Sequence, residues 1–282
     1  MMQGLKSGAL AFIGDLTVDY YPKLNKKHLG GSSLNSAIWA LRSGTDRVSI
    51  VAAVGDDEVG TAYLRKMREL GIEDAGVSVF RGITSNIEIF VDRSTGERQW
   101  GNWEAGVLGR YHLGDKAFDH LRVQSAASLT IYGKTAHLLT ELSDWGRNEE
   151  RKPFLAVNFD DLSQFTRSIN VVEKHIDGID AAFFGLDKEA DEEIIKDISA
   201  LSRDTGKLMI VTIGKYGAVA FQGGNELLSP AYTVENVIDT TGAGDAFLAG
   251  FIVCYMKTND VQASLAVGNN IASQKIQILG AY

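Results

Sequence analysis

The sequence predicts an α/β fold, a three-layer domain with a parallel sheet and a small antiparallel β lid. Nearly continuous apolar runs, typical of parallel strands covered on both faces, occur at 9–14, 48–55, 128–133, 154–159, 181–185 and 208–214. Apolar residues with helical spacing lie between these runs, at 34–41, 63–70 and 194–201. Alternation of strand and helix favours a parallel sheet with helices on both faces.

Two regions interrupt this alternation, residues 16–30 and about 79–110. Within the second, the segment NIEIFVD (86–92) alternates apolar and polar residues, which is typical of a strand buried on one face. The following DRSTGERQW (92–100) is expected to be a hairpin connection. We therefore expect a single domain over 1–282, in which both regions form the lid.

The composition is that of a globular protein without nucleic-acid partners. Of the 282 residues, 45% are hydrophobic and 23% are charged, and the formal net charge is −8. An acidic chain lacks the positive surface that binds nucleic-acid phosphates. No apolar run approaches the ~20 residues that span a bilayer, and the first apolar stretch ends in Asp15, unlike a secretory signal. We expect a cytoplasmic protein without a membrane partner.

Two common phosphate-binding motifs are absent from the sequence. No GxGxxG follows a predicted strand. The GKT at 133–135 resembles the end of a P-loop, but that motif requires a glycine where this chain has Ser128. A turn at the end of a strand explains GKT better.

The stretch DTTGAGDAF (239–247) precedes an apolar segment with helical spacing. The first amides of a helix lack intrahelical acceptors and lie at the positive end of its dipole, so they bind anions. Glycine lets a phosphate approach the backbone, and Asp245 could accept the proton of a hydroxyl that attacks this phosphate. The alternative is structural: Asp245 caps the helix and the glycines turn the chain.

DTTGAGDAF resembles the C-terminal signature of the ribokinase-like (PfkB) carbohydrate kinases. GGSSLNSAIWALRSG (30–44) resembles the N-terminal signature of that family, and the order and separation of the two signatures also agree. The similarity in layout covers essentially the whole chain. It implies a ribokinase-like fold that uses ATP and Mg²⁺ to phosphorylate a sugar hydroxyl, and a homodimer formed through the lids.

The resemblance implies roles for individual residues. Asp245 would be the catalytic base, and the anion hole would consist of Gly242, Ala243 and Gly244. The sugar hydroxyls would be bound by Asp15, Asn35 and the backbone of Gly30 and Gly31. Carboxylate and carboxamide groups suit hydroxyls, which both donate and accept hydrogen bonds. The alternatives are a turn residue at the end of a strand for Asp15 and a polar residue near a helix start for Asn35.

The segment VTIGKYGAVAF (211–221) resembles the nucleotide-binding segment of the family. By this resemblance Thr212, Gly214 and Gly217 would approach the phosphates and ribose of ATP, and Asn269 would lie near the adenine. A plain hairpin explains the two glycines equally well, and a helical surface position is the alternative for Asn269.

The metal sites are where the sequence departs from the family. Its Asn-x-x-Glu motif, whose glutamate helps to place the magnesium-bound phosphates, is replaced here, with Gly185 and Lys188 at the two positions. Glu189 could substitute through water, or could simply begin a solvated helix. Asp239 would line a monovalent-cation site, for example for K⁺, in those members that have one; its alternative role is to stabilise the glycine loop.

Three segments resemble the fructoselysine 6-kinase branch of the family: 18–31, 101–107 and 275–282. These enzymes phosphorylate a ketose that carries an amino acid. Such a tail would require polar groups in the lid, for which Glu88, Asn102 and Glu104 are candidates. Two alternatives remain: a kinase of the same fold for ribose, fructose or a nucleoside, and a non-catalytic sugar-binding sensor. Lys188 favours the sensor, and the intact GAGD argues against it.

Overall fold

The computed structural model describes residues 8–91 and 98–282. Within these residues, one sheet has nine strands in the order β13-β12-β11-β10-β9-β8-β1-β4-β5. Its strands are β1 (Leu10–Gly14), β4 (Val48–Gly55), β5 (Val77–Phe80), β8 (Ala126–Thr130), β9 (Phe154–Asn158), β10 (Ala181–Gly185), β11 (Leu208–Thr212), β12 (Ala218–Gln222) and β13 (Asn225–Ser229). Neighbouring strands are parallel from β11 to β5, and only β12 and β13 pair antiparallel.

The six predicted strands are therefore present in a parallel sheet. The strand expected at 128–133 begins at Ala126 and ends at Thr130, because Gly133–Thr135 form a 3-10 turn before the next helix. The run expected at 208–214 ends as a strand at Thr212, and Gly214–Tyr216 form another 3-10 turn, η6.

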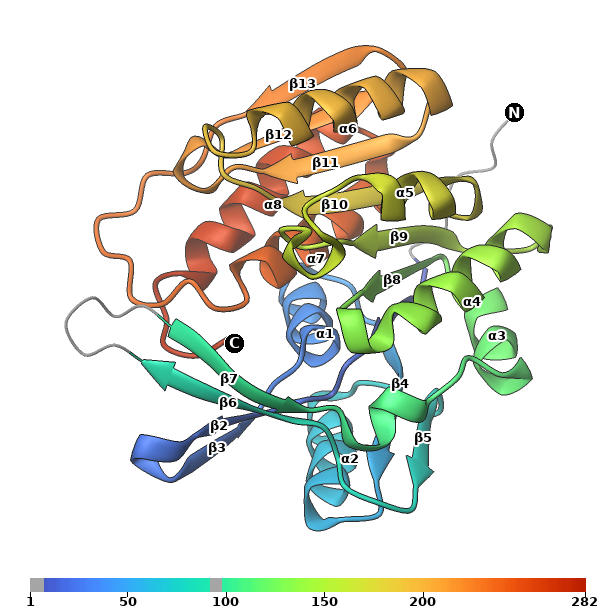
Figure 1. Ribbon diagram of the computed structural model, residues 1–282, viewed down its shortest axis with the longest axis vertical. Coiled ribbons are helices and arrows are strands. Elements are labelled where there is room, and N and C mark those ends of the chain that lie inside the picture. Colours follow the sequence, from blue (N-terminus) through green and yellow to red (C-terminus); the bar gives the residue numbers. More distant parts are fainter. Residues whose placement is uncertain (1–7, 92–97) are drawn as a thin grey trace.

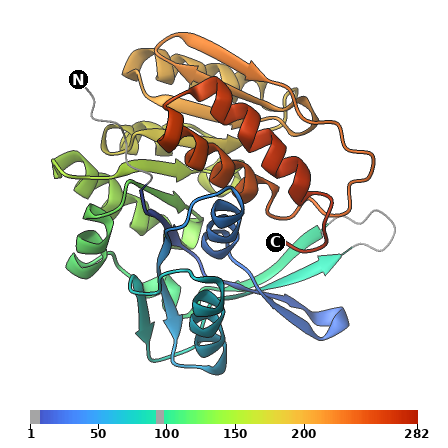
Figure 2. The same cartoon turned by 180° about the vertical axis from the view of Figure 1, so that it is seen from behind.

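Helices cover both faces of this sheet. One face carries α1 (Ser32–Arg42), α2 (Glu58–Leu70), α7 (Ala243–Thr258) and α8 (Val261–Lys275), and the other carries α3 (Asp115–Arg122), α4 (Ala136–Asn148), α5 (Asn170–His175) and α6 (Glu192–Thr205) (Figures 1 and 2). Each layer has its own apolar core against the sheet. The predicted three-layer α/β fold is confirmed. None of the helices in the described ranges is long and apolar enough to cross a membrane.

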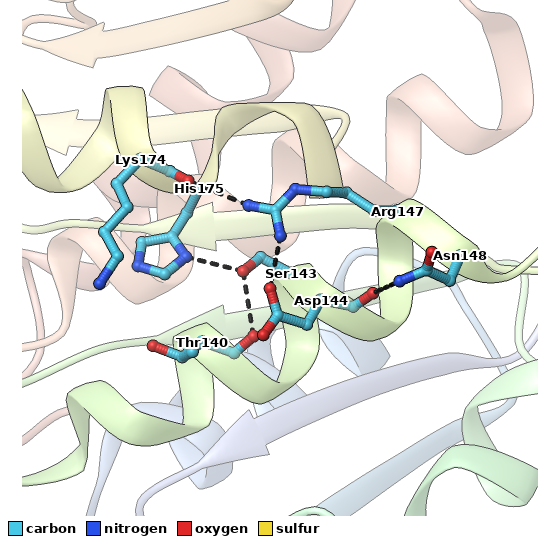
Figure 3. A network of polar contacts seen from close by, with 7 residues as sticks. All are labelled: Thr140, Ser143, Asp144, Arg147, Asn148, Lys174 and His175. Atoms are coloured by element: carbon cyan, nitrogen blue, oxygen red, sulfur yellow. Dashed lines mark hydrogen bonds and ion pairs between the residues drawn. The ribbon is translucent and has the colours of Figure 1, made fainter.

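Polar contacts also join helices within a layer. Between α4 and α5, the Ser143 hydroxyl is hydrogen-bonded to Nδ1 of the buried His175 at 2.7 Å, and Arg147 donates to the Lys174 carbonyl at 3.0 Å (Figure 3). Burial is the main cause that lowers the pKa of His175, and the charges of Lys174 and Arg147 add to it. The network thus joins α4 to α5 around a histidine whose charged form is disfavoured by burial.

A second sheet is formed by β2 (Val18–Tyr21), β3 (Lys26–Leu29), β6 (Asn86–Val91) and β7 (Arg98–Glu104), in the order β3-β2-β6-β7. We call it the small sheet; it projects from the large one (Figure 1). β2–β3 and β6–β7 pair antiparallel, as expected, whereas β2–β6 is parallel. The strand β5, which overlaps the start of the 79–110 region, belongs to the large sheet. Most of the expected hairpin connection, 92–97, lies outside the described residues.

Candidate active site

The GAGD stretch lies where α7 begins. Gly242 occupies the N-cap position with a φ of 74°, and no side chain caps the helix. The Ala243 amide donates to the Thr240 carbonyl at 3.1 Å, whereas the next amides have no acceptor within the helix because they belong to its first turn. The interpretation of Asp245 as a helix cap is wrong, because this residue lies inside the first turn and its carboxylate contacts another helix.

The two glycines of this stretch have different surroundings. A Cβ on Gly242 would lie 3.1 Å from the Cβ of Ala281, and its positive φ favours glycine. A Cβ on Gly244 would meet nothing within 4 Å. Packing therefore does not require glycine at 244, and its effect is to leave the backbone at the start of α7 accessible.

Asp245 is 8% exposed and accepts a hydrogen bond from Asn35 Nδ2 at 2.9 Å. Burial raises the pKa of its carboxyl to about 7; the hydrogen bond from Asn35 opposes this shift, and the negative charge of Asp15 adds to it. The pairing arises because α1 packs against α7. A carboxyl that titrates near neutral pH is suited to accept a proton from a hydroxyl.

Asp15 follows β1 and accepts a hydrogen bond from the Ser32 amide, the first of α1, at 3.0 Å. Burial raises the pKa of this carboxyl to about 6. Gly31 has a φ of 90°, and a Cβ there would lie 2.6 Å from the Asp15 carbonyl oxygen. The Gly30 amide and carbonyl are both hydrogen-bonded to the Tyr63 hydroxyl, at 3.0 and 3.1 Å. The four predicted sugar-binding positions thus lie around the start of α1.

The sequence interpretation assigned no individual role to three residues of this region. The Ser32 and Tyr132 hydroxyls are 2.6 Å apart. Burial is the main cause that raises the pKa of Tyr132, and the negative charges of Asp15, Asp245 and Asp160 add to it. Asp160 is solvent-accessible, yet desolvation and the charge of Asp161 raise its pKa to about 6. Its place just after β9 was the available signal, since ligands bind at the carboxyl ends of parallel strands.

The small sheet turns one face towards these residues. The Trp103 ring packs edge-on against that of Tyr132, with centroids 5.7 Å apart. Residues paired across strands share a face, so Asp19 and Ile87 lie on the same side as Trp103. A Cβ on Gly30 would lie 2.8 Å from the Asp19 carboxylate, which is thus close to the start of α1.

The expectation that acidic residues of the lid point towards a ligand is corrected for two of its candidates. Glu104 pairs with Asn86 opposite Val18, and Glu88 pairs with Tyr20, so both glutamates lie on the face away from Trp103. Asn102 is exposed, and its main-chain amide donates to Glu88 Oε2 at 3.3 Å. Sequence alternation alone could not tell which face was which.

The predicted nucleotide-binding residues lie at the ends of β11 and β13. The Thr212 hydroxyl donates to the Phe184 carbonyl at 3.1 Å, and a Cβ on Gly214 (φ 55°) would meet nothing within 4 Å. In contrast, a Cβ on Gly217 (φ 98°) would lie 2.1 Å from the Ser229 carbonyl oxygen. Asn269 is buried and donates to that same carbonyl at 2.9 Å. Gly217 and Asn269 therefore hold the end of β13.

The two predicted metal ligands have different surroundings. Glu189 is exposed, and its amide donates to Asp187 Oδ1 at 2.9 Å. The carboxylate of Asp239 accepts hydrogen bonds from the main-chain amides of Thr241 at 2.9 Å and Gly280 at 2.8 Å. These bonds join the glycine loop (239–244) to the C-terminal segment (276–282). In the described part of the chain, no three His, Cys, Asp or Glu residues cluster as a metal site would require.

This fold, with acidic residues and two helix starts at the carboxyl ends of parallel strands, defines an α/β protein of the ribokinase-like class. Residues 15–282 match the family described as "pfkB family carbohydrate kinase", and the chain belongs to this family. It is accordingly an ATP-dependent carbohydrate kinase, as the resemblance predicted.

Individual relatives agree with this assignment. The chain is 28% identical over 273 residues to fructoselysine 6-kinase of Escherichia coli strain K12, which covers 97% of this chain and 99% of that one. It is 24% identical over 278 residues to fructosamine kinase FrlD of Bacillus subtilis strain 168, covering 97% and 92%. Adenosine kinase from Sinorhizobium meliloti shares the fold, with a TM-score of 0.81 and 20% identity over 98% of this chain and 96% of that one.

Proposed function

We propose that this kinase phosphorylates a fructosamine, a ketose that carries an amino acid on its first carbon. The observation that carries the kinase chemistry is the buried Asp245 carboxyl, with a pKa of about 7, at the open start of α7. The choice of a fructosamine is supported by the similarity to fructoselysine 6-kinase over nearly the full length of both chains.

In the proposed reaction, Asp245 accepts the proton of the attacking sugar hydroxyl. The hydroxyl oxygen forms a bond to the γ-phosphorus of ATP while the bond from this phosphorus to the bridging oxygen of ADP breaks. Of the proposed anion hole, Gly242, Ala243 and Gly244, the exposed Gly244 would stabilise the transferred group most directly, because the Ala243 amide already donates to the Thr240 carbonyl. Asn35 keeps the carboxylate aligned through its 2.9 Å hydrogen bond.

The sugar hydroxyls are proposed to bind at the start of α1. Asn35 Oδ1 is buried and has no hydrogen-bond partner among the described residues. Because an unpaired buried oxygen is costly, a hydroxyl donor from the ligand would stabilise it. Asp15, which accepts from the first amide of the same helix, offers further acceptors, and the backbone of Gly30 and Gly31 is proposed to lie beside the sugar.

ATP is proposed to lie over Thr212 and Gly214, with the adenine beside the β13 end that Gly217 and Asn269 support. Mg²⁺ needs only one or two carboxylates when it is bound by phosphates, so the missing three-residue cluster is no obstacle. We propose that Glu189 holds it through water. Magnesium would neutralise the charge on the phosphates.

The domain arrangement is part of the same proposal: one kinase domain over 1–282, with the small sheet as its lid. We also propose a homodimer formed through the small sheet, on which Trp100 is 62% exposed. Light scattering on the purified protein measures its mass, and a monomer at all concentrations would contradict the dimer.

The amino group of a fructosamine would be recognised by Asp19. This carboxylate lies beside Gly30 on the face of the small sheet that carries Trp103. Glu88 lies on the opposite face and serves as a matched control, because it has the same charge in the same sheet.

The test measures ATP consumption with fructoselysine, fructose, ribose and adenosine. We expect fructoselysine to have the highest kcat/KM, and Asp245→Asn to lower kcat about 100- to 10,000-fold. Asp19→Asn should raise KM for fructoselysine but not for fructose, and Glu88→Gln should change neither. Preference for another acceptor would overturn the substrate, and an active Asp245→Asn variant would overturn the mechanism. Sugar binding without turnover would indicate a sensor.

A further inference from the structure

Lys275, the last residue of α8, is fully buried, with 0% of its surface exposed. Its ammonium group donates to the main-chain carbonyl of Asp239 at 2.6 Å and to that of Ile278 at 3.4 Å. Removing an ammonium group from water costs several kcal/mol unless it is well paired. A chain that buries this group completely must use it to hold the segments whose carbonyls it contacts.

Those segments are the glycine loop before α7 and the C-terminal segment. Besides the contacts of Lys275, the Ile238 amide donates to the Ile276 carbonyl at 2.8 Å, and Gly280 donates to the Asp239 carboxylate at 2.8 Å. Gly242, which opens α7, packs against Ala281. The buried positive charge therefore lies at the base of the loop that is proposed to bind the transferred phosphoryl group.

A bound K⁺ at Asp239 does not fit this arrangement. Main-chain carbonyl oxygens are typical ligands of hard cations, and at the Asp239 carbonyl the Lys275 ammonium already occupies one of the two lone pairs. Both oxygens of the Asp239 carboxylate accept main-chain amides, from Thr241 and Gly280. A second unit charge beside a buried ammonium would be strongly repelled.

We infer that the Lys275 ammonium is a built-in cation that takes the place of a bound monovalent metal ion beneath the phosphoryl-binding loop. The kinase therefore works without K⁺ or Na⁺. This inference rests on the proposed role of the loop in phosphoryl transfer. Its central claim, that the loop contains its own cation, is also testable without turnover.

The experiment compares KCl, NaCl and tetramethylammonium chloride at equal ionic strength. For the unmodified protein we expect Tm without ligands to be the same in all three salts, and kcat/KM to agree within about twofold, since the salts screen charges alike. A higher Tm or a several-fold higher kcat/KM in KCl than in tetramethylammonium chloride would overturn the inference. Because Tm needs no substrate, a wrong substrate assignment leaves this test intact.

The variant Lys275→Met removes the charge and keeps a long side chain. We expect a lower Tm and a lower kcat in tetramethylammonium chloride, both partly restored by KCl or NH₄Cl. The control is Lys257→Met, because Lys257 also donates to a main-chain carbonyl, that of Gly44 at 2.7 Å, but is exposed. It should resemble the unmodified protein in every salt. A Lys275→Met variant with unchanged Tm and kcat in tetramethylammonium chloride would overturn the inference.

Discussion

Replacement of Asn35 by alanine tests whether its side-chain amide tunes the pKa of Asp245, the proposed catalytic base. The Asn35 hydrogen bond lowers the pKa of Asp245, which burial raises to about 7. A hydrogen bond to a charged group contributes about 1.5–3 kcal/mol, and a shift of one pKa unit corresponds to about 1.4 kcal/mol. Without the amide, the pKa of Asp245 should therefore rise by about one to two units.

The expected result follows from the fraction of Asp245 that is ionised. At pH 7 this fraction, and with it kcat/KM, should fall about 5- to 50-fold in Asn35→Ala. Above the new pKa the loss should largely disappear, because the base is again ionised. The assay is kcat/KM from pH 5.5 to about 10, which reports the pKa of the free enzyme.

The pH dependence separates tuning of the base from loss of a sugar contact. A missing sugar contact would raise KM equally at every pH, whereas a shifted base moves the rising limb of the profile. Ser36→Ala is the control: Ser36 is buried in the same helix but points about 100° away from Asn35 around its axis. A profile for Asn35→Ala that is lowered but not displaced would refute the reasoning.

Two further predictions concern the glycines and His175. Gly244→Ala should lower kcat about 100-fold by displacing the phosphoryl group, and Tm should be unchanged because the added Cβ meets nothing within 4 Å. Gly217→Ala should destabilise the fold by more than about 1 kcal/mol, because its Cβ would meet the Ser229 carbonyl oxygen. Unfolded His175 binds a proton near pH 6.5, above its lowered folded pKa. Stability should therefore be complete above pH 6.5 and decline as the pH falls, less so in His175→Gln. Urea unfolding midpoints measured at a series of pH values test this prediction. The same pH dependence for the unmodified protein and for His175→Gln would contradict it.

The main elements could be predicted because their signals are local in the sequence. Buried parallel strands are continuous apolar runs, and all six expected runs form strands. The glycine stretch before an apolar helix likewise identified where α7 begins. The assignment of Asp15 and Asn35 followed from the resemblance to the family, and the structure places both next to the start of α1.

Other features depend on contacts between distant segments. Lys275 has the sequence context of an ordinary helical lysine, and its contact with the Asp239 carbonyl, 36 positions away, cannot be read from that context. The faces of the small sheet follow from strand register, which alternation alone does not determine. Gly217 was assigned to the nucleotide, yet its packing against Ser229 already requires glycine.

The connection between the small sheet and α1 bears on the proposed lid and the proposed base, Asp245. Only Gly30 and Gly31 separate β3 from α1, the helix that carries Asn35. Tyr63 holds both polar groups of Gly30, and the Tyr282 hydroxyl donates to the Leu29 carbonyl at 2.6 Å. The chain is thus fixed to α2 and to the C-terminal residue before α1 begins. If the small sheet closes over a sugar as the proposed lid, its movement would be taken up before Leu29, and the hydrogen bond between Asn35 and Asp245 would stay in place.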